Sequence, residues 1–348
     1  MQYTTFGRTG VKVSRLGFGA MNIPGVPFEQ AKEALNYALD HGITYIDTAS
    51  AYRNSEEIIG ESISGRRNEF FLATKVRKRD YDSAKAEIEQ SLQRLKTGVI
   101  DLLQIHYVNY PQEFKQIMGE DGSYRAALEA KQAGKVRFIG ISGHRPELLT
   151  QWVSDGKFDQ VLFHLSLVQP FALDELVPMA TSLNMGKTAM KPLSGGFVQP
   201  VDKALRYPYS QDVHTIISGM VSAEEVKMNI NALEREIESE ERSELEQFAS
   251  ELGQHNCRRC NYCSCPVGVR IPDVMITSVL RKKHSFLPKG EARFEGFKSS
   301  ILSCADYEPC KDKPLCEQQC PYHLPMQRTV QEAAAHYSMQ EGGRVKDE

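Results

Sequence analysis

Cysteine is missing from most of this 348-residue chain: none precedes Cys257, and all eight lie between Cys257 and Cys320. A disulfide framework therefore cannot hold the larger part of the protein together. Neither sign of charge is in large excess, since 42 Lys and Arg face 45 Asp and Glu, for a net charge of −3. Without a basic surplus to bind a phosphate backbone, a nucleic-acid partner is disfavoured.

Long hydrophobic runs are missing as well. No uninterrupted apolar stretch is long enough to span a bilayer, and residues 1–5 lack the basic start and apolar run of a secretory signal. We therefore expect a cytoplasmic protein with no membrane partner. With 41% hydrophobic and 25% charged residues, the composition is typical of a folded globular chain. Its length suits one large domain joined to a smaller one.

What is present is a regular alternation of short β-rich runs with amphipathic helical patterns. Eight strand–helix units follow one another, which predicts parallel strands joined by crossover helices. Their number and length favour a closed (β/α)8 barrel, or TIM barrel. An open doubly wound sheet alternates in the same way, but no glycine-rich dinucleotide fingerprint follows the first strand. The strands are expected at 16–19, 44–47, 70–75, 101–106, 136–142, 160–164, 186–190 and 215–218.

The pattern changes after the eighth unit, and the change predicts how the chain is divided. A hairpin made from Phe6 and residues 11–14 is expected to close the barrel floor. The barrel is followed by an acidic helical connector, a small α-rich, cysteine-rich domain and a polar tail. These four segments are predicted at residues 1–235, 236–255, 256–335 and 336–348.

Polar side chains stand at the ends of four predicted strands: Asp47, Lys75, His106 and Ser142. Tyr52 lies on the loop just after Asp47. In an eightfold barrel the C-terminal ends of the strands meet on one face, where the chemistry takes place. Taken singly, each residue could be a rim residue or a helix cap. Their convergence on one face favours an active site.

The sequence around these residues resembles the aldo-keto reductase family. The motifs that carry the resemblance lie at 9–19, 46–49, 52, 54–56, 73–75 and 105–106, and the similarity continues to Asn229. The family's catalytic Asp, Tyr, Lys and His correspond to Asp47, Tyr52, Lys75 and His106. The resemblance thus implies a barrel oxidoreductase that reduces an aldehyde or ketone.

Carbonyl reduction explains why these residue types are needed. Hydride transfer builds negative charge on the carbonyl oxygen, so an acid must donate a proton and fixed donors must stabilise the charge. A tyrosine phenol has a pKa of about 10, and a nearby ammonium such as Lys75 would lower it. Asp47 would hold Lys75 in place, and a neutral His106 would donate to the carbonyl oxygen. We therefore assign Tyr52 as the general acid.

The same resemblance implies a cofactor site beside these residues. Ser142 would face the cofactor ring, although His144 stands near it where family members usually carry Asn directly after the serine. The Gln that commonly ends the sixth strand is also replaced, with His164 nearby. The expected cofactor-binding residues are Ser142, Lys191, Gly195, Gly219, Ser222, Glu225 and Asn229.

The loop after the eighth strand bears on which cofactor is used. Residues 219–222 precede a helix N-terminus, whose unsatisfied amides and dipole favour a phosphate. Glu225 stands where NADPH-dependent relatives place basic residues, and its charge would repel a 2′-phosphate. We therefore favour NADH, or NAD(H), over NADP(H). FMN, which carries a single phosphate, would also fit.

The cysteine-rich segment carries the sharpest local motif. Three cysteines at two-residue gaps, followed by a Cys-Pro, resemble the bacterial ferredoxin run that binds a [4Fe–4S] cluster. This first set and the second set are Cys257, Cys260, Cys263 and Cys265, then Cys304, Cys310, Cys316 and Cys320. The arrangement also resembles an aldo-keto reductase subfamily with a C-terminal ferredoxin-like domain.

Eight cysteines match two [4Fe–4S] clusters. By analogy with two-cluster ferredoxins, Cys320 would complete the first set, and Cys265 would join the second. One cluster with spare thiols also fits the spacing. Structural zinc, which takes four cysteines from short-gap pairs, is the other alternative.

An electron-counting problem follows from joining a reductase to such clusters. Nicotinamide gives up two electrons as hydride, a cluster takes one at a time, and a flavin can do both. Three functions therefore remain open: a carbonyl reductase coupled to the clusters, an FMN enzyme serving a ferredoxin or other one-electron carrier, and a zinc-stabilised binding or regulatory protein. The intact catalytic residues argue against the third. The substrate loops, 108–122 and 197–211, do not identify the small carbonyl substrate.

Overall fold

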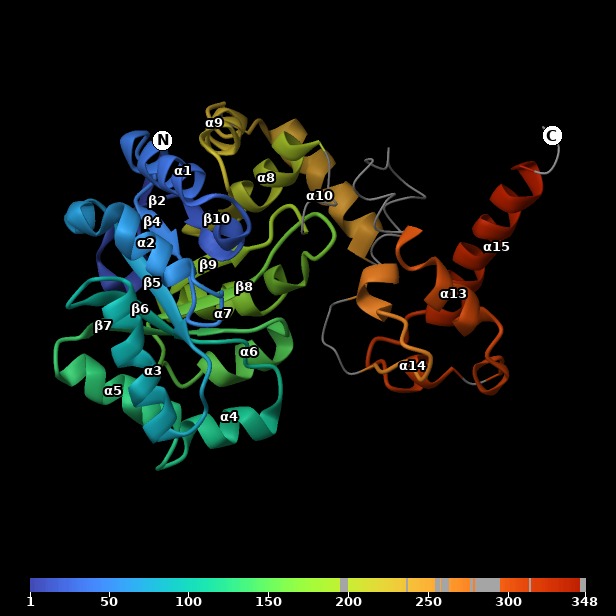
Figure 1. Ribbon diagram of the computed structural model, residues 1–348, viewed down its shortest axis with the longest axis horizontal. Helices are drawn as coiled ribbons and strands as arrows, with labels where there is room; N and C mark the ends of the chain where they lie inside the picture. Colours follow the sequence, from blue (N-terminus) through green and yellow to red (C-terminus); the bar gives the residue numbers. More distant parts are fainter. Residues whose placement is uncertain are drawn as a thin grey trace.

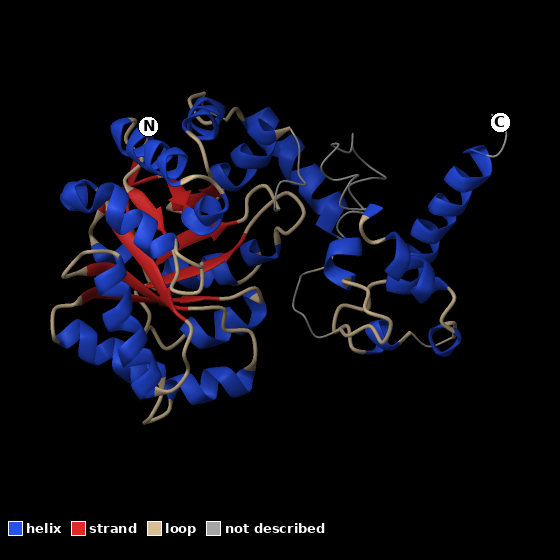
Figure 2. Ribbon diagram, in the orientation of Figure 1, coloured by secondary structure: helices blue, strands red, loops and turns tan. Residues whose placement is uncertain are grey.

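The computed structural model describes residues 1–194, 200–235, 237–253, 257, 263–275, 278, 295–312 and 314–344. Figure 1 shows two lobes, a large one from the N-terminal part of the chain and a smaller helical one from the C-terminal part. In Figure 2 the strands gather inside the large lobe, with helices around them. No helix among the described residues is both long and apolar enough to cross a bilayer.

The strands of the large lobe close into a barrel in the order β10-β3-β4-β5-β6-β7-β8-β9. Neighbouring strands are parallel all the way round. The predicted barrel is therefore confirmed, and the open doubly wound sheet is excluded. The barrel strands are β3 Leu16–Gly19, β4 Tyr45–Asp47, β5 Phe71–Val76, β6 Ile100–Ile105, β7 Val136–Ser142, β8 Gln160–His164, β9 Gly186–Met190 and β10 Thr215–Gly219.

Amphipathic helices cover the outside of the barrel because their apolar residues recur at helical spacing. In α1 (Phe28–Asp40), for example, Ala31, Leu35 and Ala38 are buried. Helix α4 lies in the segment that the sequence predicted as a substrate loop. Further helices of this lobe are α2 Ser55–Ile63, α3 Tyr81–Arg94, α4 Pro111–Met118, α5 Ser123–Gln132, α6 Pro146–Val153, α7 Leu176–Ser182, α8 Val201–Ser210 and α9 Ala223–Ala232.

A short hairpin closes the N-terminal end of the barrel, as predicted, but its first strand ends before Phe6 rather than including it. Strand β1 (Tyr3–Thr5) pairs antiparallel with β2 (Lys12–Ser14). The buried ring of Phe6 packs edge-on against Tyr45, with 5.6 Å between the ring centroids. A Cβ at Gly186 would lie 2.7 Å from the Phe6 ring, so this close approach requires glycine. The hairpin fills the floor and leaves the opposite end of the barrel for the site.

The chain leaves the barrel through α10 (Ser239–Gly253), which lies within the predicted connector. Leu245 and Ala249 of this helix are buried against the rest of the protein. The small lobe contains α13 Lys298–Ala305, α14 Leu315–Gln318 and α15 Met326–Arg344. Helix α15 runs across residue 336, where the sequence predicted the polar tail to begin.

Specific contacts join the small lobe to the C-terminal face of the barrel. Gln169, on the loop after β8, donates its side-chain N–H to the carbonyl of Cys257 at 2.9 Å. The hydroxyl of Tyr322 donates to the carboxylate of Glu147, in the first turn of α6 after β7. The small lobe therefore lies against the strand ends at which a barrel carries out its chemistry.

Candidate active site

A buried ion pair lies at the C-terminal ends of two neighbouring strands. Lys75 Nζ on β5 is 2.5 Å from Asp47 Oδ1 on β4, and the two side chains are only 1% and 6% exposed. The ammonium also donates to the Thr48 carbonyl at 2.6 Å. The register of β4 with β5, which pairs Asp47 with Ala73, brings both charges to the same end of the barrel. Each charge in such a buried pair depends on the other for compensation.

Tyr52 lies beside this pair. Lys75 Nζ is 4.9 Å from the centroid of the Tyr52 ring, and the backbone N–H of Tyr52 donates to the Ala49 carbonyl at 3.0 Å within the turn after β4. Burial raises the pKa of Tyr52, and Lys75 lowers it by less, so the net pKa lies above the usual 10.0. The predicted effect of Lys75 is present, but the prediction of an unusually acidic phenol is wrong because burial outweighs it.

Lys75 and His106 are held in different protonation states, the lysine charged and the histidine neutral. Burial lowers the pKa of Lys75, but the combined effect of Asp47 and Tyr52 raises it by more. The net pKa of Lys75 is therefore above its usual value, and the side chain stays charged. The ring of His106 stands edge-on to Tyr52, with 5.6 Å between centroids. Burial, followed by the field of Lys75, holds the pKa of His106 well below 6.5. This direction agrees with the neutral imidazole expected from the sequence.

Gln104, a residue that the sequence analysis does not single out, completes the buried network. Its side chain is fully buried on β6 and donates to Asp47 Oδ2 at 2.9 Å. Gln104 precedes His106 by two residues, so strand alternation points both side chains to the barrel interior. The two-residue spacing from His106 along the strand is the sequence signal that could have identified Gln104. Gln104 and Lys75 together fix the orientation of the Asp47 carboxylate.

Ser142, at the end of β7, supports the turn that carries His106. Its Oγ accepts the N–H of Tyr107 at 2.9 Å and donates to the Ile105 carbonyl at 3.3 Å. Tyr107 has a positive φ of 55°, a conformation that side chains other than glycine rarely adopt. Ser142 therefore stabilises an unusual backbone turn. A cofactor ring that contacts Ser142 would meet a hydroxyl that already makes these two hydrogen bonds.

Three of the expected cofactor-binding residues, Ser222, Glu225 and Asn229, belong to α9 or its N-cap. Ser222 accepts the N–H of Glu225 at 3.2 Å, and the Glu225 carboxylate accepts the N–H of Val221 at 2.8 Å. This arrangement is a variant of the capping box, because the Glu225 carboxylate accepts from the residue before the N-cap Ser222 rather than from Ser222 itself. Asn229 is buried further along the helix, where it donates to the Ser218 hydroxyl at 2.9 Å. The Glu225 carboxylate thus already accepts the backbone N–H of Val221, which would otherwise be available to a phosphate.

The remaining expected cofactor residues lie on neighbouring loops of the same face. Gly219 ends β10 just before this helix start. Lys191 follows β9 with a positive φ of 57°, and its carbonyl accepts the N–H of Ser194 at 2.9 Å. Gly195 lies outside the described residues. The expected site residues thus form two groups at the barrel mouth. One contains Asp47, Tyr52, Lys75 and His106, and the other contains Ser222, Glu225 and Asn229.

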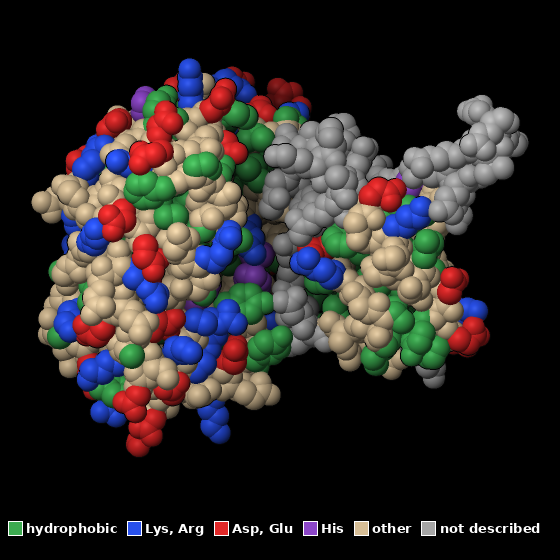
Figure 3. All heavy atoms as spheres, viewed as in Figure 1, with side chains coloured by type: hydrophobic (Ala, Val, Ile, Leu, Met, Phe, Trp, Pro, Cys, Tyr) green, Lys and Arg blue, Asp and Glu red, His purple; other side chains and the backbone are tan. Residues whose placement is uncertain are grey.

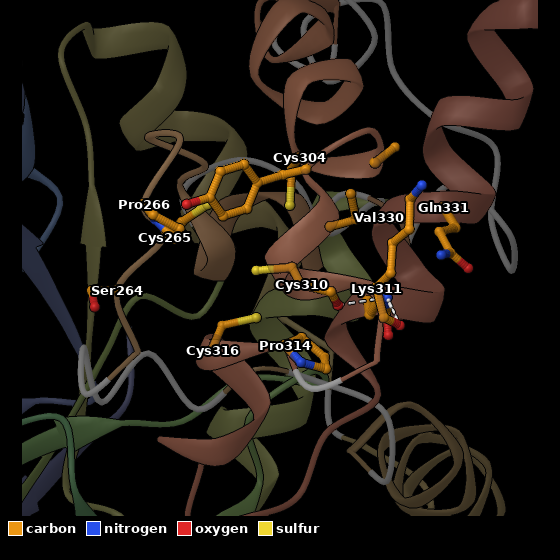
Figure 4. A pocket seen from close by; sticks show the side chains of 13 residues that line it. Ser264, Cys265, Pro266, Cys304, Cys310, Lys311, Pro314, Cys316, Val330 and Gln331 are labelled. Carbon is orange, nitrogen blue, oxygen red and sulfur yellow. Dashed lines mark hydrogen bonds between the residues drawn. The ribbon is translucent and has the colours of Figure 1, made fainter.

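Four cysteines line one cavity in the small lobe: Cys265, Cys304, Cys310 and Cys316. Figure 4 shows their sulfur atoms turned toward the same space. Burial, and next the neighbouring Cys265, raise the pKa of Cys304 to about 12. A thiol whose pKa is raised by a neighbouring cysteine lies close enough to it for their charges to interact. These are the four cysteines that the ferredoxin analogy assigned to the second cluster, with Cys265 in place of Cys320.

The first cysteine set is described in part. Cys257 and Cys320 are buried and Cys263 is half-buried, whereas Cys260 lies outside the described residues. Within the described ranges, no three His, Cys, Asp or Glu side chains approach closely enough to hold a single metal ion. A [4Fe–4S] cluster is larger than a single metal ion, and its four cysteine ligands each bind a different iron. Its ligands can therefore stand farther apart than those of one ion.

Comparison with known proteins agrees with the barrel fold. Residues 15–203 match the model of the Aldo/keto reductase family. The uncharacterized oxidoreductase YqkF of Bacillus subtilis is 30% identical over 220 residues, covering 59% of this chain and 69% of YqkF. L-galactose dehydrogenase of Arabidopsis thaliana is 27% identical over 241 residues, covering 64% and 75%. The structure of the aldo-keto reductase AKR11C1 from Bacillus halodurans, in its holo form, aligns with a TM-score of 0.63 at 26% identity, covering 71% of this chain and 96% of that one.

A closed barrel with a buried Lys–Asp pair, a tyrosine and a histidine at its mouth defines a barrel oxidoreductase. The comparisons take the assignment one step further. The chain belongs to the aldo/keto reductase family. The family and the enzyme class predicted from the sequence are therefore confirmed.

Proposed function

We propose that this protein reduces an aldehyde or ketone, with Tyr52 as the general acid. The observation that carries the proposal is the buried Lys75–Asp47 pair next to the Tyr52 ring. A bound nicotinamide supplies the hydride. Because the pKa of Tyr52 is raised, the phenol holds its proton at neutral pH until negative charge develops on the carbonyl oxygen.

The neighbours of Tyr52 stabilise the charge that its proton leaves behind. Phenolate character develops close to the Lys75 ammonium, and burial keeps water from screening the attraction. Asp47 holds that ammonium in place, and Gln104 holds Asp47. A neutral His106 can donate one N–H to the carbonyl oxygen and so orient the substrate next to Tyr52.

NADH is favoured over NADPH by the capping box of α9. The Glu225 carboxylate lies at the helix N-terminus, bonded to the Val221 N–H. A 2′-phosphate would meet this negative charge, whereas a ribose hydroxyl can donate a hydrogen bond to it. The proposed nicotinamide site thus uses the same carboxylate to cap the helix and to select the cofactor.

The small lobe, in residues 256–335, is proposed to be a ferredoxin-like domain with two [4Fe–4S] clusters. The converging thiols of Cys265, Cys304, Cys310 and Cys316 fit one cluster, because four cysteines, two of them buried and two half-buried, line a single cavity. The second cluster would take the first cysteine set together with Cys320. Such clusters transfer single electrons, which suggests a ferredoxin or another one-electron carrier as the partner.

The position of the small lobe also favours a second candidate function. Cys263 and Cys265 line the same cleft as the barrel residues His144 and Lys191. A cofactor at the barrel mouth would therefore lie next to the cysteines. If that cofactor were FMN, the enzyme could accept two electrons and release them one at a time.

One anaerobic preparation tests both candidates. Iron, sulfide, zinc and flavin are quantified on it, and NADH oxidation is followed with a series of aldehydes and ketones. Two clusters require about eight irons per chain. Stoichiometric zinc without iron would refute the clusters, and a yellow supernatant after heating would favour the FMN enzyme. The Tyr52→Phe variant should keep its iron but lose carbonyl reduction, and unchanged turnover would remove Tyr52 from the mechanism.

A further inference from the structure

The carboxylate of Glu87, in the middle of α3, joins two loops at the C-terminal face of the barrel. Its Oε1 accepts a hydrogen bond from the hydroxyl of Ser50 at 2.6 Å. Its Oε2 accepts the backbone N–H groups of Arg77 and Lys78, each at 2.9 Å. Ser50 belongs to the loop after β4, whereas Arg77 and Lys78 belong to the loop after β5. A single side chain therefore bridges the two loops.

The two bridged loops adjoin two members of the proposed reaction centre. Tyr52 lies in the same loop as Ser50, whose backbone N–H donates to the Lys75 carbonyl at 3.3 Å. The hydroxyl oxygen of Ser50 also lies 2.9 Å from this carbonyl. Lys75 itself stands on β5, just before the strand runs into the second loop. A displacement of Glu87 would therefore move Tyr52 relative to Lys75.

The loop after β5 also contacts the turn that carries His106. The guanidinium of Arg79 donates to the Tyr107 carbonyl at 3.1 Å. The backbone N–H of His106 donates to the Val76 carbonyl at 2.9 Å. The loop that Glu87 holds therefore supports the position of the histidine as well.

The sequence of the second loop explains why a carboxylate stands here. Arg77, Lys78 and Arg79 are three consecutive basic residues, and their like charges repel one another. Figure 3 shows that Lys, Arg and His side chains border the hollow between the two lobes. Two successive backbone N–H groups that converge on one oxygen form an anion-binding arrangement, and a carboxylate can accept on both of its oxygens. Glu87 thus supplies negative charge to a loop that begins with three cations.

We propose that Glu87 is a positioning residue, which holds the loops after β4 and β5 so that Tyr52 stays aligned with Lys75. The inference rests on the proposed carbonyl reduction and deepens it. Proton transfer needs its partners within hydrogen-bond reach, and a misplacement of about 1 Å can cost about 100-fold in rate. The bonds of Glu87 go to backbone amides and a hydroxyl of these loops, so it acts through the loops.

The variant Glu87→Gln tests the proposal in the intact, anaerobically prepared enzyme. Glutamine has the same length but only one acceptor oxygen, so it cannot accept from both loops. We expect kcat and kcat/KM for the carbonyl substrate to fall together by about 10–100-fold, with little change in either KM. Glu89→Gln on the same helix is the matched control, because Glu89 pairs with Lys135 at the opposite end of the barrel, just before β7. This control should keep the wild-type kcat.

The variant Ser50→Ala tests whether Glu87 acts through the loop of Tyr52. It removes the bond from this loop and leaves the two N–H bonds of the other loop in place. It should lower kcat by a smaller factor than Glu87→Gln. The double variant Ser50→Ala/Glu87→Gln should be no slower than Glu87→Gln alone, because both changes break the same link. Losses that multiply in the double variant would contradict the proposed bridge.

Hydrogen exchange needs no substrate and therefore separates this proposal from the proposed function. In Glu87→Gln, peptides covering residues 76–80 and 48–54 should both exchange faster by about fivefold or more than in wild type and Glu89→Gln. If wild type reduces no carbonyl compound but both loops respond in this way, carbonyl reduction fails and the Glu87 bridge stands. Faster exchange in 76–80 alone, faster exchange throughout the barrel, or an unchanged kcat in Glu87→Gln would overturn the positioning role.

Discussion

Replacing Asp47 with Asn should destabilise the barrel strongly, because it leaves the Lys75 ammonium buried without an anion. Only 1% of the Lys75 side chain is exposed, and the substitution leaves it with neutral partners such as the Thr48 carbonyl. Removing one member of a buried ion pair costs about 3–5 kcal/mol, against about 0–1 kcal/mol for an exposed pair. We therefore expect Asp47→Asn to lower the free energy of unfolding by about 3–5 kcal/mol.

Denaturant unfolding at neutral pH measures this loss, and the chain offers a matched control. Lys96 and Glu61 stand 2.6 Å apart, but their side chains are 50% and 53% exposed, so water can replace either partner. Glu61→Gln should cost no more than about 1 kcal/mol. The double variant Asp47→Asn/Lys75→Met should recover much of the lost stability, because it leaves no buried charge.

The same pair predicts a dependence on pH. The pKa of Lys75 is raised above 10.5 in the folded protein, so its contribution to stability is complete below 10.5 and is lost as the pH rises through the folded value. Without Asp47, burial lowers that pKa, so deprotonation at alkaline pH removes an uncompensated buried charge, and the stability difference between wild type and Asp47→Asn should narrow as the pH rises. The reasoning is refuted if Asp47→Asn stays within about 1 kcal/mol of wild type, or if the double variant is less stable than the single one.

Further predictions concern the acid, the cofactor and the clusters. Tyr52→Phe should lower kcat by about 10²–10⁴-fold without changing the unfolding free energy. Because burial raises the pKa of Tyr52, the wild-type rate should persist to about pH 10, and an alkaline decline well below that would contradict the assignment. Glu225→Gln should narrow the preference for NADH over NADPH, measured as the ratio of their KM values, since the charge facing a 2′-phosphate is gone. Cys304→Ser should lower the iron content from about eight to about four per chain, whereas Ser300→Ala on the same helix should leave it unchanged.

Much of the fold could be predicted because its signals are local. Strands β7 and β8 have the bounds expected from their runs of apolar and β-branched residues. Helix α4 was missed as a separate element, although Pro111 at its first position is a typical start signal. The four candidate catalytic residues could be placed at one face, because strand ends in a barrel meet there.

The sequence by itself determined the strand order, the family and the residue types at the barrel mouth. Tertiary structure decided the net pKa of Tyr52, since burial by distant segments outweighs the charge of its neighbour Lys75. It also decided that Glu225 caps its own helix and that Glu87 joins the loops after β4 and β5. Local patterns specify elements, whereas desolvation and the meeting of charges depend on how elements far apart in the chain pack together.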